Sequence, residues 1–108
     1  MENGVLYYNN GNIKFKGIFK DDNYQEGILY YYNCMINFKG LFIEQQYKKG
    51  ILYDKEGFKK YEGEFTHDQY NGNGILYYDK TNRIIYNGLF ENKSFIISKL
   101  YNPKEKII

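Results

Sequence analysis

Hydrophobic and polar positions alternate along short stretches of the chain, and the same alternation returns again and again. In one such stretch Phe15, Gly17 and Phe19 occupy one set of alternate positions, with Lys16 between them. A period of two is typical of a β-strand, whose successive side chains point to opposite faces. Each stretch covers about 5–7 residues, which is short for an ordinary helix. The pattern therefore predicts an all-β protein built from short strands.

Three markers recur at matching positions along the chain. An aromatic-x-Gly-x-Phe unit begins at four places, Phe15, Phe38, Tyr61 and Tyr86. A Gly-Ile/Val-Leu-Tyr unit also begins at four, Gly4, Gly27, Gly50 and Gly74. An aromatic residue follows each start of the first unit by nine positions: Tyr24, Tyr47, Tyr70 and Phe95. Such self-similarity indicates a repeat protein. We expect a single domain with a half repeat at 4–14, repeats at 15–37, 38–60 and 61–85, and a degenerate repeat and cap at 86–108.

Turn residues lie between the two units of each hairpin. Gly11 follows Asn10, and Gly57 occupies the matching place two repeats later, where Gly accepts the positive φ of a tight turn. The second copy has Cys34 there. The sequence predicts a two-residue turn at Asn10 and Gly11, and in the longer fourth hairpin a three-residue loop with Asn82 in the left-handed region.

A two-residue turn at these positions sets Leu6 opposite Phe15 and Gly4 opposite Gly17. Leucines and aromatic rings then share one face, which we expect to be structural. Its members are Leu6, Phe15, Phe19, Leu29, Phe38, Phe42, Leu52, Tyr61, Phe65, Leu76, Tyr86 and Phe90. The other face pairs Tyr7 with Lys14, Tyr30 with Asn37, Tyr53 with Lys60, and Tyr77 with Ile85.

The tyrosines of that second face form the candidate binding site. Tyrosine offers a large rigid contact area and a hydrogen bond at little entropic cost. The candidate residues for a protein partner are Tyr7, Lys14, Lys16, Tyr30, Lys39, Tyr53, Lys60, Glu62 and Tyr77. The competing interpretation, of equal weight at this point, is that these rings only cover a single-layer sheet.

Composition and charge narrow the classes of function. The chain has 15 basic and 13 acidic side chains, a net charge of +2, which gives little reason to expect nucleic acid or an anionic membrane. Its one cysteine excludes an intramolecular disulfide. With no apolar run of about 18 residues and no signal-like N-terminus, we expect a soluble, cytoplasmic protein.

The stretch Tyr61-Glu62-Gly63-Glu64-Phe65, followed by Gly72-Asn73-Gly74-Ile75-Leu76-Tyr77, resembles the MORN repeat (membrane occupation and recognition nexus). The resemblance implies an elongated, twisted single-layer antiparallel meander of about four and a half hairpin repeats. It also implies protein interaction or dimerisation and, for some members, phospholipid binding. The chain departs from the family in places: Asp68 replaces a turn glycine, and the last copy lacks the second glycine motif.

Residues with possible chemistry are better explained as structural. His67 is the only histidine and lies in a polar turn, far along the repeat from any serine nucleophile. Glu62 and Glu64 lie about 7 Å apart on one face, as alternate strand residues do. Asp21 and its polar neighbours have too few oxygen ligands for a calcium loop. We expect no enzymatic activity, no metal and no cofactor.

Function is therefore expected to be binding. The preferred hypothesis is a protein-binding module, in the form of a small inhibitor that blocks a larger partner, such as a phage anti-CRISPR or anti-defence protein or a toxin-immunity protein. Three alternatives remain open: phospholipid or membrane-surface binding, a scaffold or homodimer assembled through a sheet edge, and binding of RNA or single-stranded DNA.

Overall fold

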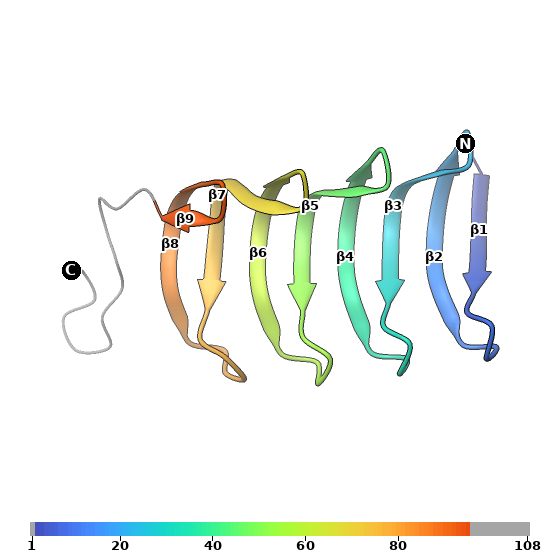
Figure 1. Ribbon diagram of the computed structural model, residues 1–108, viewed down its shortest axis with the longest axis horizontal. Helices are drawn as coiled ribbons and strands as arrows, with labels where there is room; N and C mark the ends of the chain where they lie inside the picture. Colours follow the sequence, from blue (N-terminus) through green and yellow to red (C-terminus); the bar gives the residue numbers. More distant parts are fainter. Residues whose placement is uncertain (1, 96–108) are drawn as a thin grey trace.

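The computed structural model describes residues 2–95 and shows one open, elongated antiparallel sheet (Figure 1). Eight full-length strands and a two-residue ninth follow one another in chain order, each paired with the next. The strands are β1 (Glu2–Tyr7), β2 (Ile13–Lys20), β3 (Asn23–Tyr30), β4 (Ile36–Ile43), β5 (Gln46–Tyr53), β6 (Lys59–Thr66), β7 (Gln69–Tyr77), β8 (Ile84–Glu91) and β9 (Ser94–Phe95). The predicted all-β meander is confirmed. The cap expected beyond residue 95 lies outside the described residues.

Each of the eight long strands carries a glycine that pairs with the glycines of its neighbours. This glycine ladder consists of Gly4, Gly17, Gly27, Gly40, Gly50, Gly63, Gly74 and Gly88. A Cβ on Gly40 would overlap the carbonyl oxygen of Lys49 and lie 2.7 Å from the Cα of Gly50. The backbones thus approach too closely for any side chain. The predicted pairing of Gly4 with Gly17 and of Leu6 with Phe15 is confirmed.

Aromatic rings cover the ladder on one face, called here the core face. The nine buried side chains are Phe15, Tyr24, Phe38, Phe42, Tyr61, Phe65, Tyr70, Tyr86 and Phe90. Within a hairpin two rings stack, as Tyr61 and Tyr70 do with centroids 4.0 Å apart. The ring of the next hairpin then meets the stack edge-on, as Phe90 does 5.1 Å from Tyr61. Stacked and edge-to-face pairs stabilise such a core by about 0.5–1.5 kcal/mol each beyond burial.

The predicted structural face is largely the core face, with two differences. Leu6 is 42% exposed, because β1 is the edge strand and no further repeat covers it. The buried tyrosines Tyr24 and Tyr70 were recognised in the sequence only as phase markers. A bulge beside the upper turn shifts the alternation in β2–β3, β4–β5 and β6–β7; in β2–β3 it lies where the register changes between Ile18 and Phe19. Tyr24 thereby pairs with Phe19 on the core face.

The loops at the lower end of the hairpins in Figure 1 are one residue longer than predicted. Tyr8 N–H donates to Asn12 O over 2.7 Å, and Gly11 N–H donates to Tyr8 O over 3.0 Å, which encloses a three-residue loop. Gly11 takes a φ of 92°. A bulge at the next step pairs Tyr7 with Ile13 and absorbs the extra residue. The two-residue turn was therefore wrong, although the inner register was right.

The second and third lower loops repeat this geometry with different residues, whereas the fourth encloses four residues, between Tyr78 and Arg83. Cys34 takes the left-handed position of Gly11 with a φ of 76°, and Gly57 takes it with a φ of 97°. In the fourth loop the left-handed residue is Lys80, with a φ of 55°. The expectation for Asn82 was wrong, because the turn closes earlier, through a 3.2 Å bond from Thr81 N–H to Tyr78 O.

The turns at the upper end contain two residues each, and both residues have positive φ. They are Asp21-Asp22, Glu44-Gln45, His67-Asp68 and Asn92-Lys93, with φ between 50° and 72°. None is glycine, so each left-handed residue costs about 1 kcal/mol or more. Two of the side chains link neighbouring hairpins: Gln45 Oε1 accepts from Tyr24 N–H over 2.6 Å, and Asp68 Oδ1 accepts from Tyr47 N–H over 2.7 Å.

Candidate protein-binding surface

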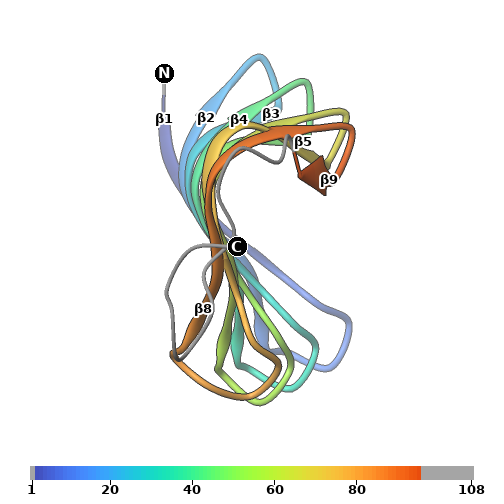
Figure 2. The same ribbon diagram turned by 90° about the vertical axis from the view of Figure 1, so that its left-hand side faces the viewer.

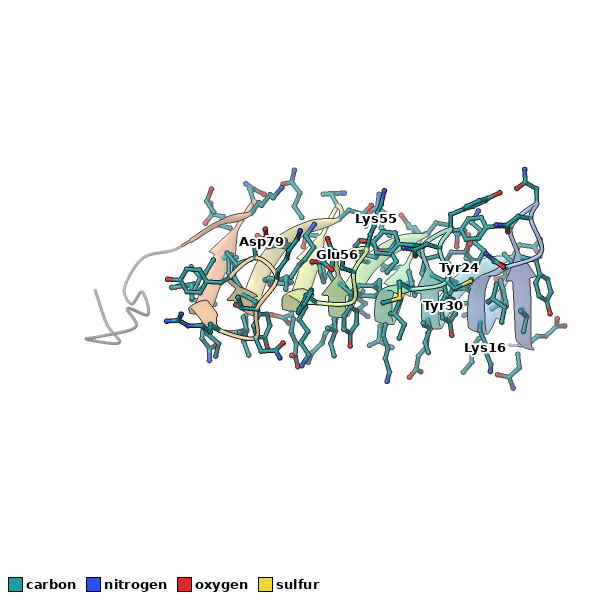
Figure 3. All side chains as sticks on the ribbon, turned by 90° about the horizontal axis from the view of Figure 1, so that it is seen from below. Lys16, Tyr24, Tyr30, Lys55, Glu56 and Asp79 are labelled. Atoms are coloured by element: carbon teal, nitrogen blue, oxygen red, sulfur yellow. The ribbon has the colours of Figure 1, made fainter. Side chains whose placement is uncertain are left out.

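The side of the sheet opposite the aromatic core is called here the outer face. In Figure 2 the upper turns curl toward one side of the sheet, and Figure 3 shows Lys16 pointing away from Tyr24 of the core. The residues beside the glycine ladder form a central row on this face, each paired with the next across the strands. The central row is Val5, Lys16, Ile28, Lys39, Ile51, Glu62, Ile75 and Asn87.

Apolar side chains on the outer face are open to solvent. Val5 is 38% exposed, Leu41 37%, Ile43 51% and Leu89 47%. They alternate with charged residues, and within the described residues no second layer of structure packs over them. A soluble sheet ordinarily turns polar residues to solvent on its uncovered face. The outer face is more apolar than an ordinary solvent-exposed sheet face.

The predicted tyrosine row lies on the outer face beside the central row. Tyr7 is 62% exposed, while the tyrosines of β3, β5 and β7 are half-buried. The hydroxyl of Tyr77 donates to Glu62 Oε1 over 3.2 Å, and Lys59 Nζ lies 3.5 Å from the same carboxylate. Burial, followed by the charge of Glu62, raises the pKa of Tyr77. The C-terminal end of the row is therefore held in place by its neighbours.

Two predicted lysines do not join this row. The bulges beside the lower loops pair Tyr7 with Ile13 and Tyr53 with Lys59, so Lys14 and Lys60 lose their predicted partners. Lys60 lines a hollow with the core residues Tyr70 and Leu76. Lys14 Nζ lies 5.8 Å from the ring of Tyr8. The predicted pairing of the tyrosine row was wrong by one residue in every hairpin.

The remaining predicted binding residues lie together on the outer face, beside residues that were not predicted. Lys16, Lys39 and Glu62 share the central row, and the tyrosine row lies two residues beyond this row on β1, β3, β5 and β7. Sequence reasoning missed Lys59 and the aliphatic members of the central row. A signal for the latter existed, since the second residue of each Gly-Ile/Val-Leu-Tyr unit must point away from the core if the leucine points into it.

The two carboxylates considered as a catalytic pair contact different neighbours. Glu64 Oε1 accepts from Asn73 N–H over 2.7 Å, whereas Glu62 contacts Tyr77 and Lys59. The two carboxylates thus have different partners and share no proton. His67 lies in an upper turn with a φ of 52°.

Residues 2–95 offer neither a cluster of metal ligands nor a membrane-spanning helix. No group of three His, Cys, Asp or Glu side chains is placed there to hold a metal ion. That part of the chain contains no helix with the length and apolarity to cross a bilayer.

Comparison with known proteins adds no relative. The chain matches no protein-family model. A search of the curated proteins finds no significant match. What can be said of its function therefore depends on the residues and their geometry.

Proposed function

We propose that this chain is a non-enzymatic protein-binding module of the MORN-repeat type, which holds a partner protein against its outer face. The observation that carries the proposal is the uncovered outer face, where aliphatic and tyrosine side chains stand on a backbone fixed by the glycine ladder. Contiguous exposed apolar surface rimmed by polar groups marks interaction sites in soluble proteins. A rigid support also lowers the entropic cost of binding.

The repeat type is supported by the positions that the motif residues take. Tyr61 and Phe65 of the best-formed copy are buried in the core, and Gly63 and Gly74 pair in the ladder. Asp68, which departs from the family's turn glycine, has a structural explanation because its carboxylate accepts a hydrogen bond from the neighbouring hairpin. The motif thus specifies the scaffold, and the variable residues of the outer face specify the partner.

The charge pattern favours a protein over a polyanion. Lys16, Lys39 and Lys49 lie on the outer face among Glu26 and Glu62, so neither sign dominates. Nucleic-acid and anionic-lipid surfaces are recognised by continuous basic patches. Mixed charge around apolar residues instead matches the composition of protein interfaces. A chain of 108 residues that covers a larger protein's surface would act as an inhibitor, as phage anti-defence and toxin-immunity proteins do.

The proposal is tested by capturing partners from source cells with wild-type protein and a variant in which the tyrosine row, Tyr7, Tyr30, Tyr53 and Tyr77, is changed to Ala. The matched control changes three exposed loop residues, Tyr32, Met35 and Phe58, to Ala. We expect the row variant to lose the partner and the loop variant to keep it. Equal capture by both would contradict the proposal. Melting curves confirm that each variant is folded.

Two further assays on the wild-type protein test the alternatives of membrane-surface binding and nucleic-acid binding. Pelleting with anionic vesicles that disappears with salt would place a membrane surface on this face. Binding to a single-stranded RNA homopolymer with a steep salt dependence would place nucleic acid there. We expect neither, because the outer face carries both signs of charge.

A further inference from the structure

Three shallow hollows on the outer face join into one groove that crosses the strands. The first extends from β1 to β3, the second from β3 to β5 and the third from β5 to β8. Neighbouring hollows share Gly27 and Ile28 at one junction and Gly50 and Ile51 at the next. The glycine ladder forms the floor of this outer groove, and the central row forms one wall. Figure 2 shows the hairpins stacked behind one another, each turned somewhat relative to the one before it, so the groove follows the twist of the sheet.

The aliphatic residues of the central row are evenly spaced along the groove. Val5, Ile28, Ile51 and Ile75 come from β1, β3, β5 and β7, so consecutive members are two strand spacings, about 9.6 Å, apart. A polyproline-II helix repeats its side-chain direction every three residues, or about 9.3 Å. Over the three intervals such a chain drifts by about 0.9 Å from the row. An α-helix, which repeats near seven residues or about 10.5 Å, drifts by about 2.7 Å.

Charged residues occupy the positions between these aliphatic residues. Lys16 and Lys39 are exposed and form no ion pair within the described residues, whereas the carboxylate of Glu62 already contacts Lys59 and Tyr77. Glu26 also lines the second hollow, so the β1–β5 part of the groove, with Lys16, Lys39 and Lys49, carries a net positive charge. It matches acidic side chains placed between every two apolar contacts of a bound chain.

The tyrosine row supplies a second feature suited to an extended chain. Polyproline-II segments make no internal hydrogen bonds, so their carbonyl groups remain free to accept. Of the tyrosine row, Tyr30 lines the first hollow and so borders the β1–β3 end of the groove. Aromatic-lined grooves recognise polyproline-II segments in several unrelated domains.

From these features we infer that the outer groove binds an extended, polyproline-II-like segment of the partner. The segment carries an aliphatic or proline residue at every third position and acidic residues opposite Lys16 and Lys39. This inference rests on the proposed protein-binding function and names the chemistry of its partner. It also assigns the specificity to Lys16 and Lys39, while the aliphatic residues of the central row set the spacing.

The test uses labelled nonapeptides and fluorescence anisotropy with the whole chain. The probe is (Leu-Pro-Glu)₃, compared with (Leu-Pro-Lys)₃ and with the flexible (Leu-Gly-Glu)₃. We expect the probe to bind at least about tenfold more tightly than either comparison peptide. The double variant Lys16→Glu/Lys39→Glu reverses the preference between acidic and basic peptides. The control Lys55→Glu/Lys60→Glu, with the same change in net charge away from the outer face, keeps it.

Each failure has a separate meaning. Equal affinity for the proline and glycine peptides, no binding of the probe, or an unchanged preference in Lys16→Glu/Lys39→Glu would overturn the inference. Sedimentation that shows a stable dimer which does not bind the probe would also overturn the inference, in favour of a second copy in the groove. If partner capture still depends on the tyrosine row, the proposed function survives these outcomes. If that dependence fails, the proposed function itself is overturned.

Discussion

The two faces of this sheet are made by the same strands, and they differ in how strictly the repeat is kept. On the core face every hairpin presents an aromatic ring over paired glycines, and Phe15, Phe38 and Tyr61 are fully buried. On the outer face the corresponding alternate positions vary from Lys16 to Glu62 along one row. The difference shows that stability is assigned to one set of alternate residues. Under the proposed function, the other set is free to vary with the partner that it recognises.

The largest contrast between the faces is expected from deleting apolar side chains in β4. Phe38→Ala removes a ring that is 0% exposed and stacked on Tyr47, with centroids 4.3 Å apart. It should lower the free energy of unfolding by about 3–5 kcal/mol. Leu41→Ala, three residues away on the outer face, should cost less than about 1 kcal/mol. Urea denaturation measures both, and similar losses would contradict the assignment of the faces.

A single added methyl group on the ladder should be nearly as damaging. Gly40→Ala places a Cβ against the Lys49 carbonyl oxygen and 2.7 Å from the Cα of Gly50. The strands must separate, at a cost of about 3 kcal/mol. Gly11→Ala, at a lower loop with a φ of 92° and no atom within 4 Å of the new Cβ, should cost about 1 kcal/mol. Thermal melts that rank the two variants in the opposite order would refute the close-packed ladder.

The link between hairpins at the upper turns should have an intermediate effect. Asp68→Ala removes the acceptor of the 2.7 Å bond from Tyr47 N–H and leaves an alanine in the left-handed region. We expect a loss of about 1–2 kcal/mol in denaturant unfolding. Asp68→Asn keeps an acceptor oxygen and tolerates positive φ, so it should lie close to wild type. If both variants were equally destabilised, the carboxylate charge and not the hydrogen bond would be responsible.

Alkaline pH should weaken the core face through its buried tyrosines. Burial, followed by the nearby charges of Asp68 and Tyr31, raises the pKa of Tyr47 to about 12. Between pH 10 and 12 the unfolded chain loses this proton while the folded chain keeps it, so stability falls as pH rises. Tyr47→Phe cannot ionise, but it loses the hydroxyl bond to Asn37. At pH 8 the variant should therefore have a lower free energy of unfolding than wild type, and this difference should be smaller at pH 12. A difference that stays the same across this pH range would contradict the prediction.

How much of this architecture could be predicted is clearest at the loops. The spacing of Gly4 and Gly17 gave the strand pairing, because period two and the ladder leave one register that buries the rings. The loop length was misjudged, since a three-residue loop followed by a bulge leaves the inner pairs of a two-residue turn unchanged. Bulges are local distortions with no strong sequence signal here, and they moved Lys14 and Lys60 off the outer face.

The sequence likewise predicted some residues of the candidate site but not its shape. Lys16, Lys39 and Glu62 lie where alternation placed them, since the bulges do not reach the middle of the strands. The groove could not be predicted from the sequence, because it depends on how closely the glycine backbones approach and on how the hairpins stack. Those are properties of the packed sheet as a whole.

The most direct test of the claim that the outer face binds the partner is site-specific photo-crosslinking within the complex. A photoreactive residue replaces Leu41 on the outer face in one protein and Lys60, exposed on the core side, in another. Both proteins are irradiated with the same captured partner, and the adducts are quantified by mass spectrometry. We predict an adduct from position 41 and none from position 60. An adduct from position 60 alone would show that the partner lies on the core side and would contradict the account.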